Sequence, residues 1–257
     1  MEMLEKNNSL KAQANGLGIN FDALEELAKV VIESGLSPLS TTKAVMIAVL
    51  QGRELGLPPM ASINNIYDIN GKATQSIHLM NGLALKNNVI FKILTDYKPI
   101  VVYRDGNQME YPEEMVLQFV KEEKWSLIDS KYLKNQDVLA ALPKDRKCII
   151  RYTVDYVTTV EGTRKWSDGR VMTLPSSYYY STAQNSGLVK PNSAWTKNAR
   201  NQMFVRALAN LFRLLGDDFL LGLNYETTEM LDANGINYNV TDEGKIEYSD
   251  IVEDENN

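Results

Sequence analysis

Residues 192–216 constrain the fold more than any other segment, because their pattern predicts one long amphipathic helix. Asn192 or Ser193 can cap its start, and Gly216 can end it. At about 100° per residue, the side chains separate into a broad apolar face and a narrow polar face. The apolar face comprises Met203, Phe204, Ala207, Leu208, Leu211, Leu214 and Leu215, and the polar face comprises Trp195, Gln202, Arg206 and Arg213. The apolar face requires a core against which the helix packs.

The polar face combines the fixed positive charges of Arg206 and Arg213 with a flat aromatic ring and an amide. Guanidinium groups bind phosphates and aromatic rings stack on bases, so this combination suits single-stranded nucleic acid. The alternative is an ordinary solvated helix face, because exposed arginine is common on helices. Spacing alone favours that alternative.

Three blocks follow one another between residues 41 and 231. The first reads GRELGLPPM at 52–60, INNIY at 63–67 and INGK at 69–72, and the second reads AQNSGL at 183–188. The third is the spaced series Trp195, Thr196, Lys197, Met203, Arg206, Ala207, Arg213, Asp217, Asp218, Gly222, Tyr225 and Glu229. In content and order, these blocks resemble the RecT family of phage single-strand annealing proteins. That family usually has a proline where this chain has residues 198–201.

The resemblance implies an ATP-independent protein of phage or prophage recombination that coats single-stranded DNA and promotes pairing with a complementary strand. It implies a homo-oligomer, either a ring or a helical filament, in the cytoplasm of a bacterial host. A phage exonuclease and a host single-strand-binding protein are the further partners that it suggests. No cofactor is expected, because base pairing itself reads the match while the protein grips phosphates.

Three candidate DNA-binding cations belong to predicted strands or turns. Lys72 follows the Asn70-Gly71 turn, where it is either a plain turn lysine or, as the resemblance suggests, a DNA contact. Arg104 ends one strand, and Arg151 alternates onto the polar side of another. Either arginine could line a sheet face that DNA crosses, or could form a cross-strand ion pair.

Three more candidate cations, Lys190, Lys197 and Arg200, flank the start of the long helix. The first turn of a helix carries free backbone N–H groups and a partial positive charge. A phosphate could therefore dock there.

The distribution of predicted elements indicates an α+β fold with small antiparallel hairpins packed against helices. Helices are predicted at 21–34, 41–55, 76–86, 112–123, 135–142, 176–185 and 192–216, and strands at 65–69, 72–75, 89–95, 100–104, 150–156 and 170–174. Asn70-Gly71 and Asp168-Gly169 are hairpin turns. No βαβ rhythm is present, which argues against a doubly wound sheet.

Composition excludes several classes of protein. With one cysteine, Cys148, and one histidine, His78, the chain can form neither an internal disulfide nor a Cys/His zinc site. No apolar run approaches the ~20 residues of a membrane span. Residues 1–20 lack the apolar core of a signal peptide, so a reducing cytoplasm is expected.

The net charge of −6 is concentrated near the end of the chain. Eight of the 33 acidic residues but only one of the 27 basic residues lie beyond residue 231, so residues 1–231 carry a net charge of +1. We therefore expect three segments: a flexible 1–19, a DNA-binding core at 20–231, and an acidic, disordered and dispensable tail at 232–257. Local basic patches, rather than total charge, govern phosphate binding.

Catalytic motifs are missing from the sequence. The acidic pairs Glu113-Glu114 and Asp217-Asp218 are adjacent, and adjacent helical residues point about 100° apart, so neither pair can chelate one ion. Neither a phosphate-binding loop nor a nucleophile elbow occurs. A non-enzymatic annealing protein is expected, with a metal-dependent nuclease and a generic single-strand-coating or structural oligomer as alternatives.

Overall fold

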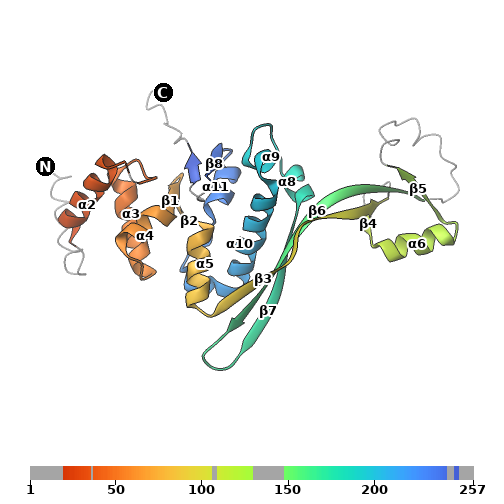
Figure 1. Cartoon of the computed structure of the whole chain (residues 1–257), viewed down its shortest axis with the longest axis horizontal. Helices are drawn as coiled ribbons and strands as arrows, with labels where there is room; N and C mark the ends of the chain where they lie inside the picture. The colour runs from red at the N-terminus through yellow and green to blue at the C-terminus, as the bar shows by residue number, and fades with distance from the viewer. Residues whose placement is uncertain (1–19, 36, 106–108, 130–147, 242–245, 249–257) are drawn as a thin grey trace.

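The computed structural model describes residues 20–35, 37–105, 109–129, 148–241 and 246–248. A helical N-terminal region leads into a central body, from which a long β-arm projects to one side (Figure 1). The α+β class predicted from the sequence is confirmed. In the described part of the chain, no helix combines the length and apolarity needed to span a membrane.

The N-terminal region begins with α2 (Phe21–Glu33) and α3 (Thr42–Glu54), which the side chains of Asn20 and Thr41 cap. The short α4 (Pro59–Asn65) follows, and then β1 (Ile66–Ile69) and β2 (Lys72–Gln75) form the hairpin predicted at Asn70-Gly71. Gly52 lets α3 approach α4, since a Cβ there would lie 1.8 Å from Ser62 Oγ. The first sequence block therefore has a packing role.

The central body is built around two neighbouring helices, α5 (Ile77–Lys86) and α10 (Ala199–Leu220) (Figure 1). One side of α10 packs on a sheet, where Gly162 leaves room for Leu211 and Leu215. Buried residues lie on nearly every side of α10. Leu214, which the sequence pattern assigns to the apolar face, is exposed. The helix is thus central to the fold, and its polar face also needs a partner.

The arm consists of β3 (Val89–Arg104) paired antiparallel with β6 (Cys148–Lys165). Nearer the body, β7 (Val171–Tyr179) pairs with β6 and forms the hairpin predicted at Asp168-Gly169. At the far end lie β4 (Glu110–Tyr111), α6 (Glu113–Lys121) and β5 (Trp125–Asp129), which runs parallel to β6. The ring of Trp125 packs on Phe119 and Tyr111, with centroid distances of 4.3 and 4.6 Å.

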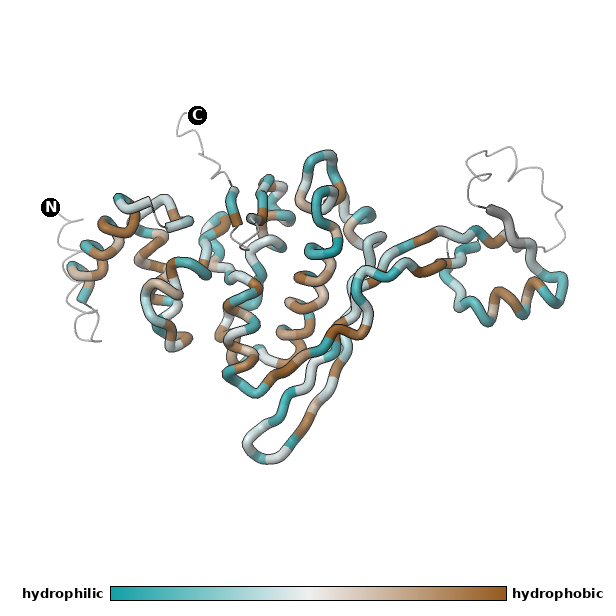
Figure 2. Tube along the Cα trace, viewed as in Figure 1, coloured by the Kyte–Doolittle hydropathy of each residue, from teal (hydrophilic) through white to brown (hydrophobic). Residues whose placement is uncertain are grey.

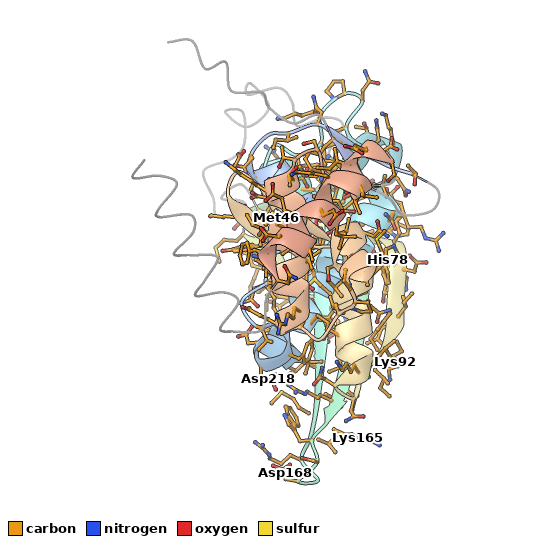
Figure 3. The ribbon with its side chains drawn as sticks, turned by 90° about the vertical axis from the view of Figure 1, so that its left-hand side faces the viewer. Met46, His78, Lys92, Lys165, Asp168 and Asp218 are labelled. Carbon is orange, nitrogen blue, oxygen red and sulfur yellow. The ribbon has the colours of Figure 1, made fainter. Side chains whose placement is uncertain are left out.

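Hydrophobic side chains remain exposed along the arm. In Figure 2, hydrophobic and hydrophilic segments alternate from the body to its far end. The large exposed apolar residues there include Ile90, Ile93, Leu94, Val101, Val154, Val171 and Met172. Figure 3 places Lys165 and Asp168 at the tip of the β6–β7 hairpin, away from the body. An apolar surface of this kind is typical of an interaction site.

Several predicted boundaries are wrong. The two strands at 89–95 and 100–104 form one continuous β3, because bulges at residues 93–98, with Tyr97 at φ 44°, bend the strand without ending it. Residues 176–179 belong to β7, so the helix predicted at 176–185 is reduced to α8 (Tyr180–Asn185). The helix predicted at 135–142 lies outside the described residues.

The long helix also differs from its prediction at both ends. It divides at Asn198 into α9 (Ala194–Lys197) and α10, and Asn198 caps α10 by accepting a hydrogen bond from the Asn201 N–H. Gly216 has non-helical backbone angles, but the helix continues to Leu220. A Cβ at Gly216 would lie 2.0 Å from the Phe219 ring, so this glycine allows that ring to pack on the backbone.

The expectation of a disordered tail beginning at residue 232 is wrong for residues 232–241 and 246–248. Asp232 lies within α11 (Thr227–Ala233), and β8 (Tyr238–Val240) pairs with β9 (Ile246–Tyr248). Tyr238 and Ile246 are buried, because their apolar surfaces complete the central core. Residues 1–19 and 249–257 lie outside the described residues.

Candidate nucleic-acid interface

The polar face of the long helix is buried, which overturns the expectation that it faces solvent. Gln202 and Trp195 are each 1% exposed, Arg206 is 4% exposed, and Arg213 is half-buried. In this structure, the four side chains hold protein elements together.

Arg206 and Arg213 meet the acidic side of α11. Arg206 Nη2 donates to Asp232 and to the Thr228 carbonyl oxygen at 3.1 Å. Its Nη1 lies 3.7 Å from a Glu226 oxygen and 3.6 Å from a Glu229 oxygen. Arg213 forms two hydrogen bonds with Glu229, one of them 2.8 Å long. We call Arg206, Arg213, Glu226, Glu229 and Asp232 the ion network.

Local sequence spacing creates the ion network. The two arginines are seven residues apart, which is about two helical turns, so they share one face of α10. The three carboxylates recur at every third residue, with Glu226 as the N-cap of α11 and Glu229 and Asp232 within the helix. Trp195 joins this arrangement, because its Nε1 donates to Asp232 at 2.9 Å and its ring stacks on Tyr178.

Glu226 is the most deeply buried carboxyl group of the ion network. Burial raises its pKa, whereas nearby Arg206 and the Thr228 hydrogen bonds act in the opposite direction. Its Oε2 caps α11 by accepting from the Thr228 N–H at 2.9 Å and the Glu229 N–H at 3.3 Å. Burial also lowers the pKa of Arg213, and the charge of Arg206 adds to this effect.

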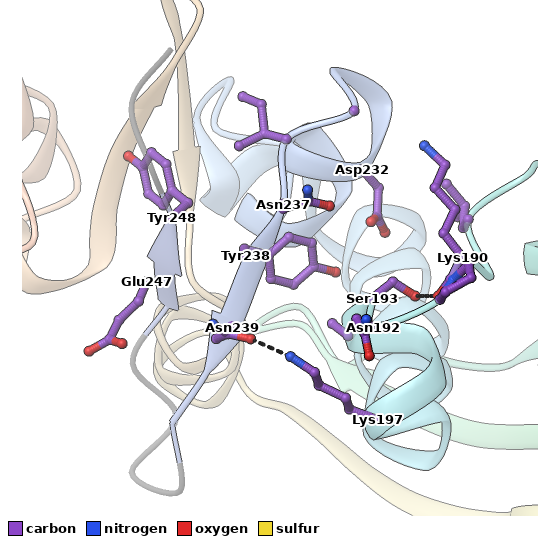
Figure 4. A pocket seen from close by; sticks show the side chains of 15 residues that line it. Lys190, Asn192, Ser193, Lys197, Asp232, Asn237, Tyr238, Asn239, Glu247 and Tyr248 are labelled. Carbon is purple, nitrogen blue, oxygen red and sulfur yellow. Dashed lines mark hydrogen bonds between the residues drawn. The ribbon is translucent and has the colours of Figure 1, made fainter. Parts of the chain in front are cut away.

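Two of the predicted cations, Lys190 and Lys197, do lie together, in an open pocket of about 560 Å³ (Figure 4). Residues 188–197 form one wall and residues 235–239 with 247–248 form the other. Lys197 Nζ donates to Asn239 Oδ1 at 3.0 Å, while the Lys190 ammonium has no partner among the described residues. We call this pocket the lysine cleft.

The lysine cleft offers amides as well as charge. Asn192, Asn237 and Asn239 line it, together with Tyr238 and Tyr248. Glu247 and Asp232 also line it, so two carboxylates oppose the two lysines, although Asp232 is itself bonded to Arg206 and Trp195. Ammonium and amide groups can hold phosphate and sugar oxygens without reading the sequence of the bases.

The other predicted cations lie elsewhere. Arg200 is exposed and pairs with Asp96 at the bulge of β3, which lowers the pKa of that carboxyl group. Lys72 lies on the β1–β2 hairpin with its Nζ 5.8 Å from the centre of the Tyr225 ring. Arg104 and Arg151 face each other across β3 and β6 at the far end of the arm.

The two arm arginines differ in their partners. Arg104 pairs with Glu110 at 2.7 Å, as the cross-strand ion-pair alternative anticipated, whereas Arg151 has no ionic partner within the described ranges. The predicted cations therefore fall into three groups: those of the lysine cleft, those of the ion network, and those at separate positions on the surface. Among them, only Lys190 and Lys197 line the lysine cleft.

Sequence reasoning missed Asn237, Asn239 and the three carboxylates of the ion network. The asparagines carry no distinctive pattern. The carboxylates do carry one, because Glu226, Glu229 and Asp232 repeat at helical spacing and Glu226 forms a capping box with Glu229. Recognising α11 would have supplied a partner for the two arginines.

Comparison of the chain with protein-family models, with curated proteins and with solved structures finds no match. Within the described ranges, no group of three or more His, Cys, Asp or Glu residues is placed to hold a metal ion.

Proposed function

We propose that the chain is an ATP-independent single-strand annealing protein, which coats single-stranded DNA as a homo-oligomer and promotes its pairing with a complementary strand. The observation that carries the proposal is the lysine cleft, where two lysines and three asparagines surround an open pocket. These groups suit a sugar-phosphate backbone of any sequence. The order of the three RecT-like blocks supports the same function.

In the proposed mechanism, the protein contributes binding energy and alignment without covalent chemistry. The lysine clefts of successive subunits hold phosphates of one strand. Most bases remain free, so a second strand is tested by Watson-Crick pairing. Weak contacts multiply along the strand because neighbouring subunits raise one another's effective concentration.

The β-arm supports the oligomeric part of the proposal. Ile90 and Val154 are each 59% exposed, and further apolar residues continue along β3 and β7. A neighbouring subunit would bury this surface and so favour assembly.

Addition of two complementary strands in sequence, without ATP or added metal, tests this function. Light scattering should report larger assemblies than with one strand, and these should resist salt better because pairing and subunit contacts add to the electrostatic attraction. Equal size and equal salt resistance with two non-complementary strands would contradict annealing. A generic single-strand-coating protein would then be the better description.

A further inference from the structure

A second pocket, of about 530 Å³, lies at the N-terminal ends of α5 and α10. Its walls are about half apolar and half polar and include two aromatic rings; the apolar residues are Ile77, Phe91, Phe204, Val205, Leu208, Val240 and Ile246. His78 is exposed and also lines it, and Figure 3 shows His78 at an edge of the molecule. Aromatic rings beside precisely placed polar groups can bind an organic ligand.

Gln202 supplies one unused polar group to this pocket. The residue is 1% exposed, and its Oε1 accepts a hydrogen bond of 3.0 Å from the Tyr238 hydroxyl. Burial raises the pKa of Tyr238, so the hydroxyl stays protonated and acts as the donor. The Gln202 Nε2 group is thereby left as a donor, and it has no partner among the described residues.

Glu226 supplies the second unused polar group. It is 1% exposed and lines the same pocket. Its Oε2 accepts from the Thr228 N–H, the Thr228 hydroxyl and the Glu229 N–H, whereas its Oε1 has no hydrogen-bond partner within the described part of the chain. Neither this oxygen nor Gln202 Nε2 is among the described side-chain atoms that are both fully buried and unpaired, so each is open to a hydrogen bond with a ligand in the pocket.

Tyr238 connects this pocket to the lysine cleft. Its side chain lines the cleft, while its hydroxyl bonds to Gln202 in the second pocket. The walls of the two pockets are thus linked by one hydrogen bond, from Tyr238 to Gln202.

We propose that the second pocket binds one nucleobase per subunit, with Gln202 Nε2 donating to an acceptor on the base edge and Glu226 Oε1 accepting a base N–H. Phe91 and Phe204 pack against the base. This inference rests on the proposed single-strand binding, and it adds a base anchor that fixes each subunit's position on the strand. The remaining bases stay available for pairing.

The test compares Gln202→Met with Tyr238→Phe. Both substitutions remove the hydrogen bond between these two side chains, but only Gln202→Met removes the donor that faces the base. Affinity is measured for an oligothymidylate strand and for an abasic strand of equal length. The wild type and Tyr238→Phe should prefer the base-bearing strand by about tenfold, and Gln202→Met should lose most of that preference. An equal preference in all three proteins would overturn the inference.

A second measurement separates failure of the pocket from failure of the proposed function. Saturation-transfer NMR with free deoxyguanosine and thymidine probes the pocket without any strand. If the wild type binds no strand and still gives nucleoside signals that Gln202→Met loses, that result would support the nucleobase pocket and contradict the annealing function. If neither nucleoside gives a signal in a protein that binds strands, the base anchor is wrong.

Discussion

The ion network and the lysine cleft both contain cations that a sequence pattern assigns to DNA, yet their surroundings differ. Arg206 is 4% exposed and faces three carboxylates, whereas Lys190 is exposed and has no partner among the described residues. Helical periodicity separates faces correctly but does not reveal what covers each face. The number of opposing carboxylates in the fold, rather than the position of an arginine on a helix, distinguishes a structural cation from a binding one.

Truncation after Leu231 should show the largest difference between the two regions. It removes Asp232, the partner of Arg206 and Trp195, together with the buried Tyr238 and Ile246. Breaking the buried pair alone costs about 3–5 kcal/mol, so loss of cooperative thermal unfolding is expected.

Truncation after Tyr248 provides the matched control, because it retains every residue of the ion network and of β9. Its melting temperature should stay close to that of the full chain. Equal melting temperatures for both truncations would show that residues 232–248 contribute nothing to stability.

Arg206→Ala should give the next largest effect. It leaves Asp232 and Glu226 buried beside each other without their cation, at a cost of about 3–5 kcal/mol in the free energy of unfolding. Urea unfolding measures this cost. Arg200→Ala, which removes an exposed arginine of the same helix, should leave the midpoint almost unchanged. If Arg206→Ala is as stable as the wild type but binds DNA more weakly, Arg206 contacts DNA and is not a structural residue.

A smaller effect is expected from pH. Because burial raises the folded-state pKa of Glu226, its proton stabilises the fold at low pH, and this contribution is lost as pH rises through that pKa. Glu226→Gln cannot ionise. Its stability relative to the wild type should therefore increase as the pH rises above about 4.3, the ordinary pKa of glutamate. The urea midpoints of both proteins are measured across this range. If the midpoint of Glu226→Gln minus that of the wild type stays constant or falls as pH rises, the pKa of Glu226 is not raised.

Local signals predicted much of the helical part of the fold. The helices α2, α3 and α5 were predicted to within a residue or two, because Asn20, Thr41 and Ser76 cap them with their own side chains. The β1–β2 hairpin followed from Asn70-Gly71, which adopt the positive φ values that this turn requires.

Non-local contacts account for most of the errors. The continuity of β3 through Tyr97 depends on its pairing with β6, and no residue within β3 signals it. The burial of Arg206 depends on α11, which lies about twenty residues further along the chain and was not predicted. For the same reason, the sequence identified Lys190 and Lys197 as binding candidates but not the asparagines opposite them.

The salt dependence of single-strand binding tests most directly whether the binding cations are those of the lysine cleft. In the double variant Lys190→Ala/Lys197→Ala, the slope of log affinity against log salt should become shallower by up to about 1.4, or about 0.7 for each lost phosphate contact. Its melting temperature should match that of the wild type, because neither lysine belongs to the ion network. An unchanged slope in the folded double variant would contradict the account.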